Sequence, residues 1–191
     1  MDVKTVVQFQ FNGSFELLAE LLGDMTDDEW QARPFKGANL IGFTVWHCAR
    51  TMDWALNCAL RGSPELADLD EWRDVKVEEA AFGAGASRGA SDRVARDVSR
   101  VRVLEYTSML RAGAISWLAA LPTEELSTAI DLKAAHAMKP AYMAPAVWAE
   151  IEDLDGIPKW QFLARPCASH IRVHYGEVAS QLESVRATTA V

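Results

Sequence analysis

Apolar residues recur at helical spacing along most of the chain, and this periodicity limits the fold more than any other feature. The first stripe repeats at intervals of four, three and four residues and consists of Phe11, Phe15, Leu18 and Leu22. It predicts a helix over about residues 3–22. Three more segments have comparable apolar periodicity and are expected to be long helices: residues 39–60, 91–121 and 166–186.

The rest of the chain carries almost no strand signal. Residues 128–158 contain Pro140, Pro145, Pro158 and an Asp-Gly turn, with room for one short helix around residues 146–153. Four long helices and one longer connection are typical of a helix bundle, and bundle cores commonly house metal sites. We therefore expect an all-α four-helix bundle with a long crossover before the last helix, formed as one domain by residues 1–191.

Two local features refine this expectation. The composition of FGAGASRGAS, residues 82–91, predicts a loop, because small flexible residues bury too little apolar area to offset their ordering entropy. Pro166 predicts a break or kink at the start of the last helix, because proline removes a backbone donor. Within the third helix, six apolar residues are expected to face the core: Val94, Val98, Val101, Met109, Ile115 and Leu118.

Charge and cysteine content exclude several classes of partner. The formal net charge is -8, which argues against a nucleic-acid-binding surface. No apolar run approaches the roughly 18–20 residues that a membrane-spanning helix needs, and the N-terminus lacks the layout of a signal peptide. The three cysteines have no CxxC spacing and are expected to be reduced thiols of a cytoplasmic protein: Cys48, Cys58 and Cys167.

Two histidines lie four residues apart in the segment SHIRVHYGEV. On a helix, His170 and His174 share one face, so both imidazoles can point at one position in the core. Two buried neutral imidazoles gain little from each other, whereas a divalent metal accepts a lone pair from both. The spacing alone is explained equally well by a surface pair or by two core histidines bonded to carbonyl groups.

A third histidine, His47, favours the metal site over these alternatives. It lies in the middle of the second predicted helix, in VWHCART, among apolar neighbours at positions 43, 46, 54 and 58. A third histidine in an apolar setting on another helix makes a three-histidine metal site the simpler explanation. Three neutral imidazoles with an open position are the arrangement of a catalytic zinc site, and nickel or iron also suits imidazole ligands.

The same two segments resemble a known family. WHCARTMDW and HIRVHYGEV are similar to the DinB-like (DNA-damage-inducible) metal-binding four-helix bundles, which place one histidine in a W/H-H-x-x-x-[TS] segment and an HxxxH followed by G-[EQ]-[IV] on the last helix. The resemblance implies His47, His170 and His174 as metal ligands. It also implies activities of the family, which include transferases and isomerases that use bacillithiol, mycothiol or glutathione.

Other residues near these motifs have two interpretations each. Glu177, one turn beyond His174, either orients a ligand or is a solvated carboxylate. Arg50 and the neighbouring Thr51 could bind an anionic substrate, although a surface salt bridge is the better explanation of Arg50. Cys167 is expected to be an apolar filler and not a ligand, and His136 is expected to be exposed.

Together these features predict a divalent-metal protein with zinc or nickel at three histidines. The leading hypothesis is a transferase that adds a low-molecular-weight thiol to an electrophilic small molecule. The alternatives are a metal-dependent hydrolase and a non-catalytic metal-binding stress-response protein. We expect a small-molecule substrate, no nucleic-acid or membrane partner, and a homodimer, because long apolar helices often pair across a two-fold axis.

Overall fold

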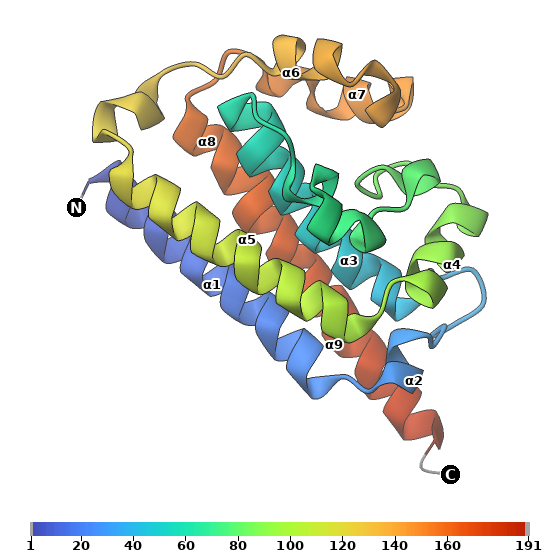
Figure 1. The fold of residues 1–191 in the computed structure, drawn as a ribbon. Coiled ribbons are helices and arrows are strands. Elements are labelled where there is room, and N and C mark those ends of the chain that lie inside the picture. The colour runs from blue at the N-terminus through green and yellow to red at the C-terminus, as the bar shows by residue number, and fades with distance from the viewer. Residues whose placement is uncertain (1, 190–191) are drawn as a thin grey trace.

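Four long helices form the body of the molecule (Figure 1). The computed structural model describes residues 2–189. The bundle consists of α1 (Val3–Asp24), α3 (Ile41–Asp53), α5 (Arg100–Ala120) and α9 (His170–Thr189). Helix α1 packs against α5 and α9, and α3 packs against α9 and α5. The predicted all-α bundle is confirmed.

The first helix follows its sequence pattern closely. All four residues of the predicted stripe are buried: Phe11, Phe15, Leu18 and Leu22. The Asp2 carboxylate accepts the Thr5 N–H at 2.8 Å and caps the start of the helix. After the chain turns, Thr26 and Glu29 form a capping box that starts the short helix α2 (Asp27–Trp30).

The third predicted helix is divided in two. Helix α4 (Arg88–Asp97) is followed by the extended residue Val98, and α5 starts after Ser99, whose hydroxyl accepts the Arg102 N–H at 3.2 Å. The prediction of one continuous helix over residues 91–121 was therefore wrong. The loop prediction for residues 82–91 was wrong at its end, because Ser87 caps α4 and the helix begins at Arg88.

The break at residues 98–99 also changes which face of α5 is buried. Its buried residues are Val103, Tyr106, Thr107, Leu110, Ala114 and Leu118. Three of the six residues expected in the core are instead 40–49% exposed: Val101, Met109 and Ile115. Val98 and Ser99 have an extended backbone between the two helices. The apolar residues of α4 and α5 therefore do not form one continuous helical face.

The crossover before the last helix contains two short helices, α6 (Leu132–Met138) and α7 (Pro145–Ile151). In Figure 1 both lie across one end of the bundle, beyond α8 (Lys159–Ala164). The expected disturbance at Pro166 is a π-helical turn over Arg165–Ser169, which joins α8 to α9. Proline lacks the N–H of a regular helix, and such wide turns often occur at functional sites.

The second predicted helix also ends in a wide turn. Helix α3 continues directly into a π-helical segment, Trp54–Ala59. Between it and α4, the chain forms three short 3₁₀ helices: Leu66–Asp68, Asp70–Val75 and Glu78–Ala80. This connection packs against α3 and α5, so α3 is covered on several sides and each of its thirteen residues is buried.

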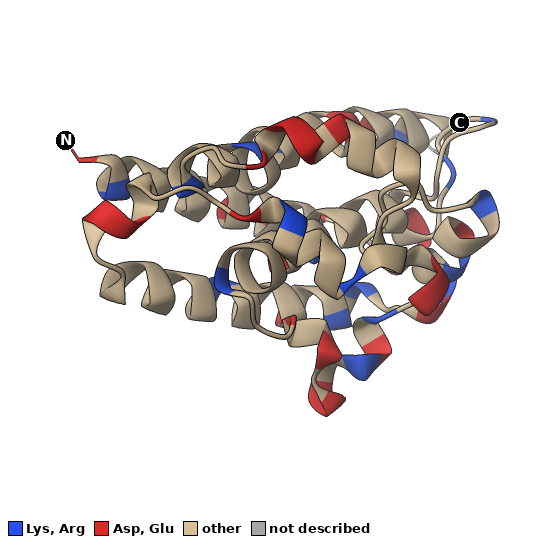
Figure 2. Ribbon diagram, turned by 90° about the horizontal axis from the view of Figure 1, so that it is seen from above, with Lys and Arg blue, Asp and Glu red and all other residues tan. Residues whose placement is uncertain are grey.

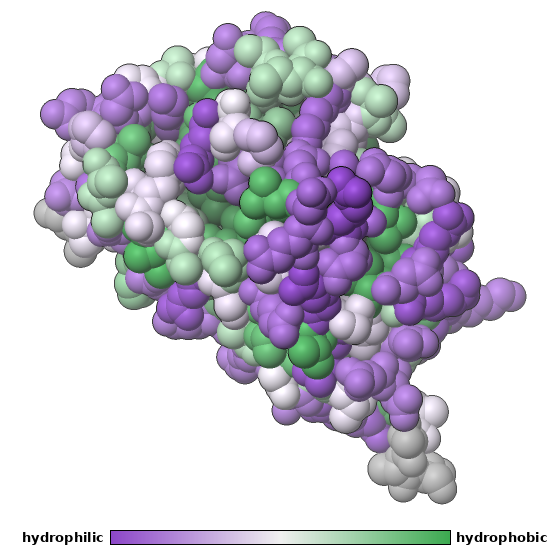
Figure 3. Space-filling view, in the orientation of Figure 1, coloured by the Kyte–Doolittle hydropathy of each residue, from purple (hydrophilic) through white to green (hydrophobic). Residues whose placement is uncertain are grey.

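The outer surface is mixed in character. Acidic and basic residues are interspersed along the ribbon in Figure 2. Green hydrophobic residues lie among purple hydrophilic ones in the view of Figure 3. Within residues 2–189, no helix combines the length and apolarity that a membrane crossing requires.

Candidate metal centre

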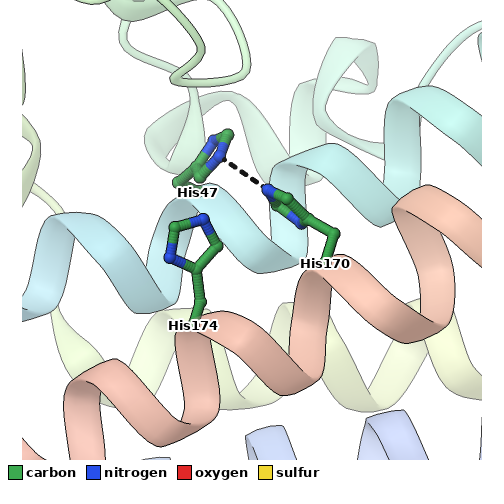
Figure 4. A group of neighbouring side chains, drawn as sticks. All are labelled: His47, His170 and His174. Atoms are coloured by element: carbon green, nitrogen blue, oxygen red, sulfur yellow. Dashed lines mark hydrogen bonds between the residues drawn. The ribbon is translucent and has the colours of Figure 1, made fainter.

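Three histidines from two helices converge inside the bundle (Figure 4). His47 comes from the middle of α3, and His170 and His174 come from the first two turns of α9. One ring nitrogen of each lies within 4.8 Å of those of the other two. His47 Nε2 is 3.2 Å from His170 Nε2. The structure therefore brings together all three histidines that the sequence singled out, in a group that could hold a metal ion.

Hydrogen bonds orient two of the rings. His47 Nδ1 lies 2.6 Å from the Phe82 carbonyl oxygen. Since a carbonyl can only accept, the imidazole proton is on Nδ1, and the unprotonated Nε2 faces His170 Nε2. His174 Nδ1 lies 2.8 Å from Glu177 Oε2, which fixes the same tautomer in a neutral ring. Partners of this kind orient histidine ligands in metal sites.

Burial keeps the imidazoles of His47 and His170 uncharged. Desolvation lowers the pKa of His47 from 6.5 to about 4, although the hydrogen bond to Phe82 acts in the opposite direction. Desolvation also lowers the pKa of His170, to about 3, with help from the two neighbouring histidines. Both rings are therefore neutral near pH 7, which is the form that binds a metal.

A glycine allows the loop before α4 to reach His47. Gly83 has φ +107, a conformation that side chains rarely adopt. A Cβ atom at this position would lie 2.4 Å from His47 Nδ1. The absence of a side chain thus lets the preceding carbonyl, that of Phe82, approach the ring. Sequence reasoning missed both residues, since it treated FGAGA only as flexible loop.

Residues 10–178 match the sequence model of the DinB superfamily, and this span contains all three histidines. The chain belongs to the DinB superfamily. No curated protein matches it. Membership agrees with the helical architecture and with a possible metal site at His47, His170 and His174.

In this DinB-superfamily protein, two of the three histidines line a cavity of about 580 Å³. Its volume is within the range of small-molecule sites. His47, Thr51 and His170 contribute to the lining. The remaining walls come from three regions. These are the start of the π-helical segment after α3 together with residues 82–85, the crossover, and the junction of α8 and α9. Their large apolar members are Trp54, Phe82, Val147, Ile151, Leu154, Phe162 and Val173.

Arg50 does not lie on the surface, so the expected surface salt bridge was wrong. Its side chain is completely buried and pairs with Asp53 at 3.2 Å and with Glu65 at 2.9 Å. The guanidinium also donates to the hydroxyl groups of Tyr106 and Tyr142. Because internal partners occupy it and it does not line the cavity, Arg50 has no place in binding an anionic substrate there.

The remaining candidates lie outside the histidine cluster. Cys167 is buried, and its burial raises the pKa of the thiol, as expected for an apolar filler. Among residues 2–189 it belongs to no group able to hold a metal. His136 stacks on Trp148 with ring centroids 4.2 Å apart and is half-buried, not exposed as expected. Thr51 Oγ1 lies 3.3 Å from His47 Nδ1, and the residue also lines the cavity, so its predicted contact with a substrate stays a prediction.

Proposed function

We propose that the protein is a metal-dependent transferase that adds a low-molecular-weight thiol to an electrophilic small molecule. One observation carries the proposal: three imidazoles, two of them kept neutral by burial, present ring nitrogens within 4.8 Å of one another beside an apolar cavity. Zinc or nickel suits three imidazole ligands. A bound divalent metal of this kind deprotonates a coordinating thiol and so supplies a nucleophile at neutral pH.

The residues of the chain have three tasks in this reaction. His47, His170 and His174 would hold the metal through the nitrogen atoms that face one another. The Phe82 carbonyl and the Glu177 carboxylate keep the rings of His47 and His174 in the tautomer that leaves these nitrogens free. The apolar cavity limits water around the reacting groups, which strengthens electrostatic interactions there.

The overall reaction balances without an oxidant or a reductant. The sulfur of the thiol forms a bond to the electrophilic carbon of the second substrate. The leaving group departs with the electron pair of the bond that breaks, and the thiol proton is released to solvent. A hydrolase would use the same three histidines with water in place of the thiol, and a metal-binding stress-response protein would have no turnover.

Metal binding is tested first. Purified protein should hold about one divalent ion per chain, in keeping with three protein ligands of a catalytic site. His47→Ala, His170→Ala and His174→Ala should each sharply reduce the metal content measured by elemental analysis. His136→Ala is the matched control, because His136 stacks on Trp148 away from the cluster. Wild-type metal content in His47→Ala would contradict a site that joins α3 and α9.

Thiol binding separates the three candidate functions. In the cobalt-substituted protein, bacillithiol, mycothiol or glutathione should produce a sulfur-to-cobalt charge-transfer band and release a proton, because the ligand is the thiolate. Conjugation of an electrophile should follow, and both signals should be lost in His174→Ala. No spectral change and no conjugation with any of the three thiols would refute the transferase and favour the hydrolase or the non-catalytic protein.

We also propose that the protein is a cytoplasmic homodimer that binds neither nucleic acid nor membranes. Support for the dimer comes from large apolar residues exposed on two helices that pack together, α1 and α5: Val6, Phe9, Val101, Met109 and Ile115. Light scattering should give about twice the chain mass of 21.1 kDa. A value near the chain mass itself at micromolar concentration would contradict the dimer.

A further inference from the structure

We infer that the cavity beside the histidines selects an electrophile with an uncharged aromatic body. This rests on the proposed function and specifies its second substrate. The aromatic body would lie between the ring cluster of Trp54, Phe82 and Phe162 and the apolar side chains of the crossover. The reactive carbon would then face His47 and His170, which line the same cavity.

The first wall is built from packed aromatic rings. Trp54 and Phe82 stack with centroids 5.1 Å apart and ring planes 10° from parallel. Phe162 meets Trp54 nearly edge-on, with centroids 6.1 Å apart and an interplanar angle of 70°. All three are at least nine-tenths buried, so their orientation is fixed by packing. A preformed set of ring faces and edges favours another flat ring, through stacked or edge-to-face contact.

Another part of the lining is aliphatic and comes from the crossover. Val147 and Ile151 project from α7, and Leu154 follows just after it. These side chains are half-buried, so part of their apolar surface remains open to a ligand. Gly85 brings the loop after Phe82 against this wall, because a Cβ there would lie 2.9 Å from Val147 Cγ2. The loop that carries Phe82 is therefore held close to the aliphatic part of the lining.

The charged residues of the lining lie at its exposed part. These two residues are Glu150 and Arg165. The Arg165 side chain is 51% exposed and carries a charge opposite to that of Glu150, whose residue is also exposed. The Arg165 guanidinium lies 4.0 Å from the Asp153 carboxylate, which is a long distance for an ion pair. Away from the proposed metal position, the interior thus offers no charged side chain to an ionic body, and burying such a body there would be costly.

A binding experiment tests the cavity without any turnover. The probe is N-phenyl-naphthylamine, an uncharged aromatic amine that fluoresces in apolar surroundings. Titration of the metal-free and metal-loaded full chain should show saturable binding of about one probe per chain, since the site is one cavity. Val147→Asp and Ile151→Asp should each raise the Kd about tenfold or more, because they place a carboxylate in the apolar wall. Circular dichroism and metal content report whether each variant is folded.

The matched control is Val3→Asp. Val3 is a half-buried apolar residue, like Val147 and Ile151, and lines a second, smaller cavity of about 240 Å³ between α1 and α8. This variant should bind the probe as the wild type does. Loss of binding in Val3→Asp with full binding in the α7 variants would overturn the inference, and so would the absence of saturable binding to the wild-type protein.

A pair of electrophiles separates this inference from the proposed function. Iodoacetamide and N-naphthyl iodoacetamide have the same reactive carbon and the same iodide leaving group, and differ in the ring body. With whichever of the three thiols supports conjugation, the kcat/KM of the wild-type protein should be about tenfold or more higher for the naphthyl compound than for iodoacetamide. Equal kcat/KM values would overturn the aromatic-body inference and leave the transferase standing. Probe binding without conjugation of either compound would refute the transferase, while the cavity would keep its aromatic selectivity.

Discussion

A single methyl group at position 83 should disturb the metal centre. In Gly83→Ala, the new Cβ would lie 2.4 Å from His47 Nδ1, whereas ordinary Cβ contacts lie at 3.4 Å or more. The ring or the loop must therefore move by about 1 Å, which lengthens the 2.6 Å contact to the Phe82 carbonyl beyond hydrogen-bond distance. Loss of such an orienting bond typically lowers metal affinity by about 10–100-fold, or about 1.4–2.7 kcal/mol.

The matched control is Gly37→Ala. Gly37 has φ +99, close to the +107 of Gly83, but a Cβ there would have nothing within 4 Å. Both variants should lose about 1–3 kcal/mol of metal-free stability to backbone strain, measured by urea unfolding with a chelator present. Only Gly83→Ala should lose metal affinity in competition with a chromophoric chelator. Equal affinities of Gly83→Ala and the wild type would refute the role assigned to this close contact.

Three further predictions concern the surroundings of the site. Glu177→Ala removes the hydrogen-bond partner of His174 and should lower metal affinity by about 10–100-fold in the same competition assay. The control Glu183→Ala changes an exposed residue of α9 and should leave the metal affinity unchanged. Arg50→Met leaves the buried carboxylates of Asp53 and Glu65 without their shared cation and should lower the free energy of unfolding by about 3–5 kcal/mol. The control Arg73→Met breaks only an exposed ion pair and should have no measurable effect in urea unfolding. The metal-free protein should lose stability as the pH falls from 6.5 towards 4, because the unfolded chain binds a proton at His47 that the folded chain does not. The same pH titration of His47→Leu should show a smaller loss of stability. An equal loss would contradict the assignment of this effect to His47.

Much of the bundle could be predicted because its signals are local. The stripe of α1 involves residues within a few positions of one another and is buried as expected. The capping box at Thr26 is equally local. The break before α5 could not be predicted with the same rules. Ser99 can either cap a new helix or continue an existing one, and neighbouring residues are compatible with both. Packing against the rest of the bundle decides between these alternatives.

The histidines of the candidate site were accessible to sequence reasoning for the same reason. His170 and His174 are one helical turn apart, so the sequence alone places them on one face. Arg50 was misread because its environment is assembled from distant segments. Glu65 and Tyr142 pair with it from the connection after α3 and from the crossover. Nothing in the local sequence of α3 indicates those partners.

The proposed metal ligands and much of the proposed substrate cavity lie on different segments of the chain. The three histidines lie on α3 and α9, two long helices of the core, whereas much of the cavity wall comes from residues 82–85 and from α7. The crossover is fastened beside the site by Tyr142, whose hydroxyl donates to the buried Glu65 at 2.8 Å. Substitutions along α7 can therefore reshape the cavity without moving a metal ligand. Changes at residues 82 and 83 cannot, because the same loop orients His47 and forms part of the wall. The histidine cluster and the cavity are therefore coupled at that loop.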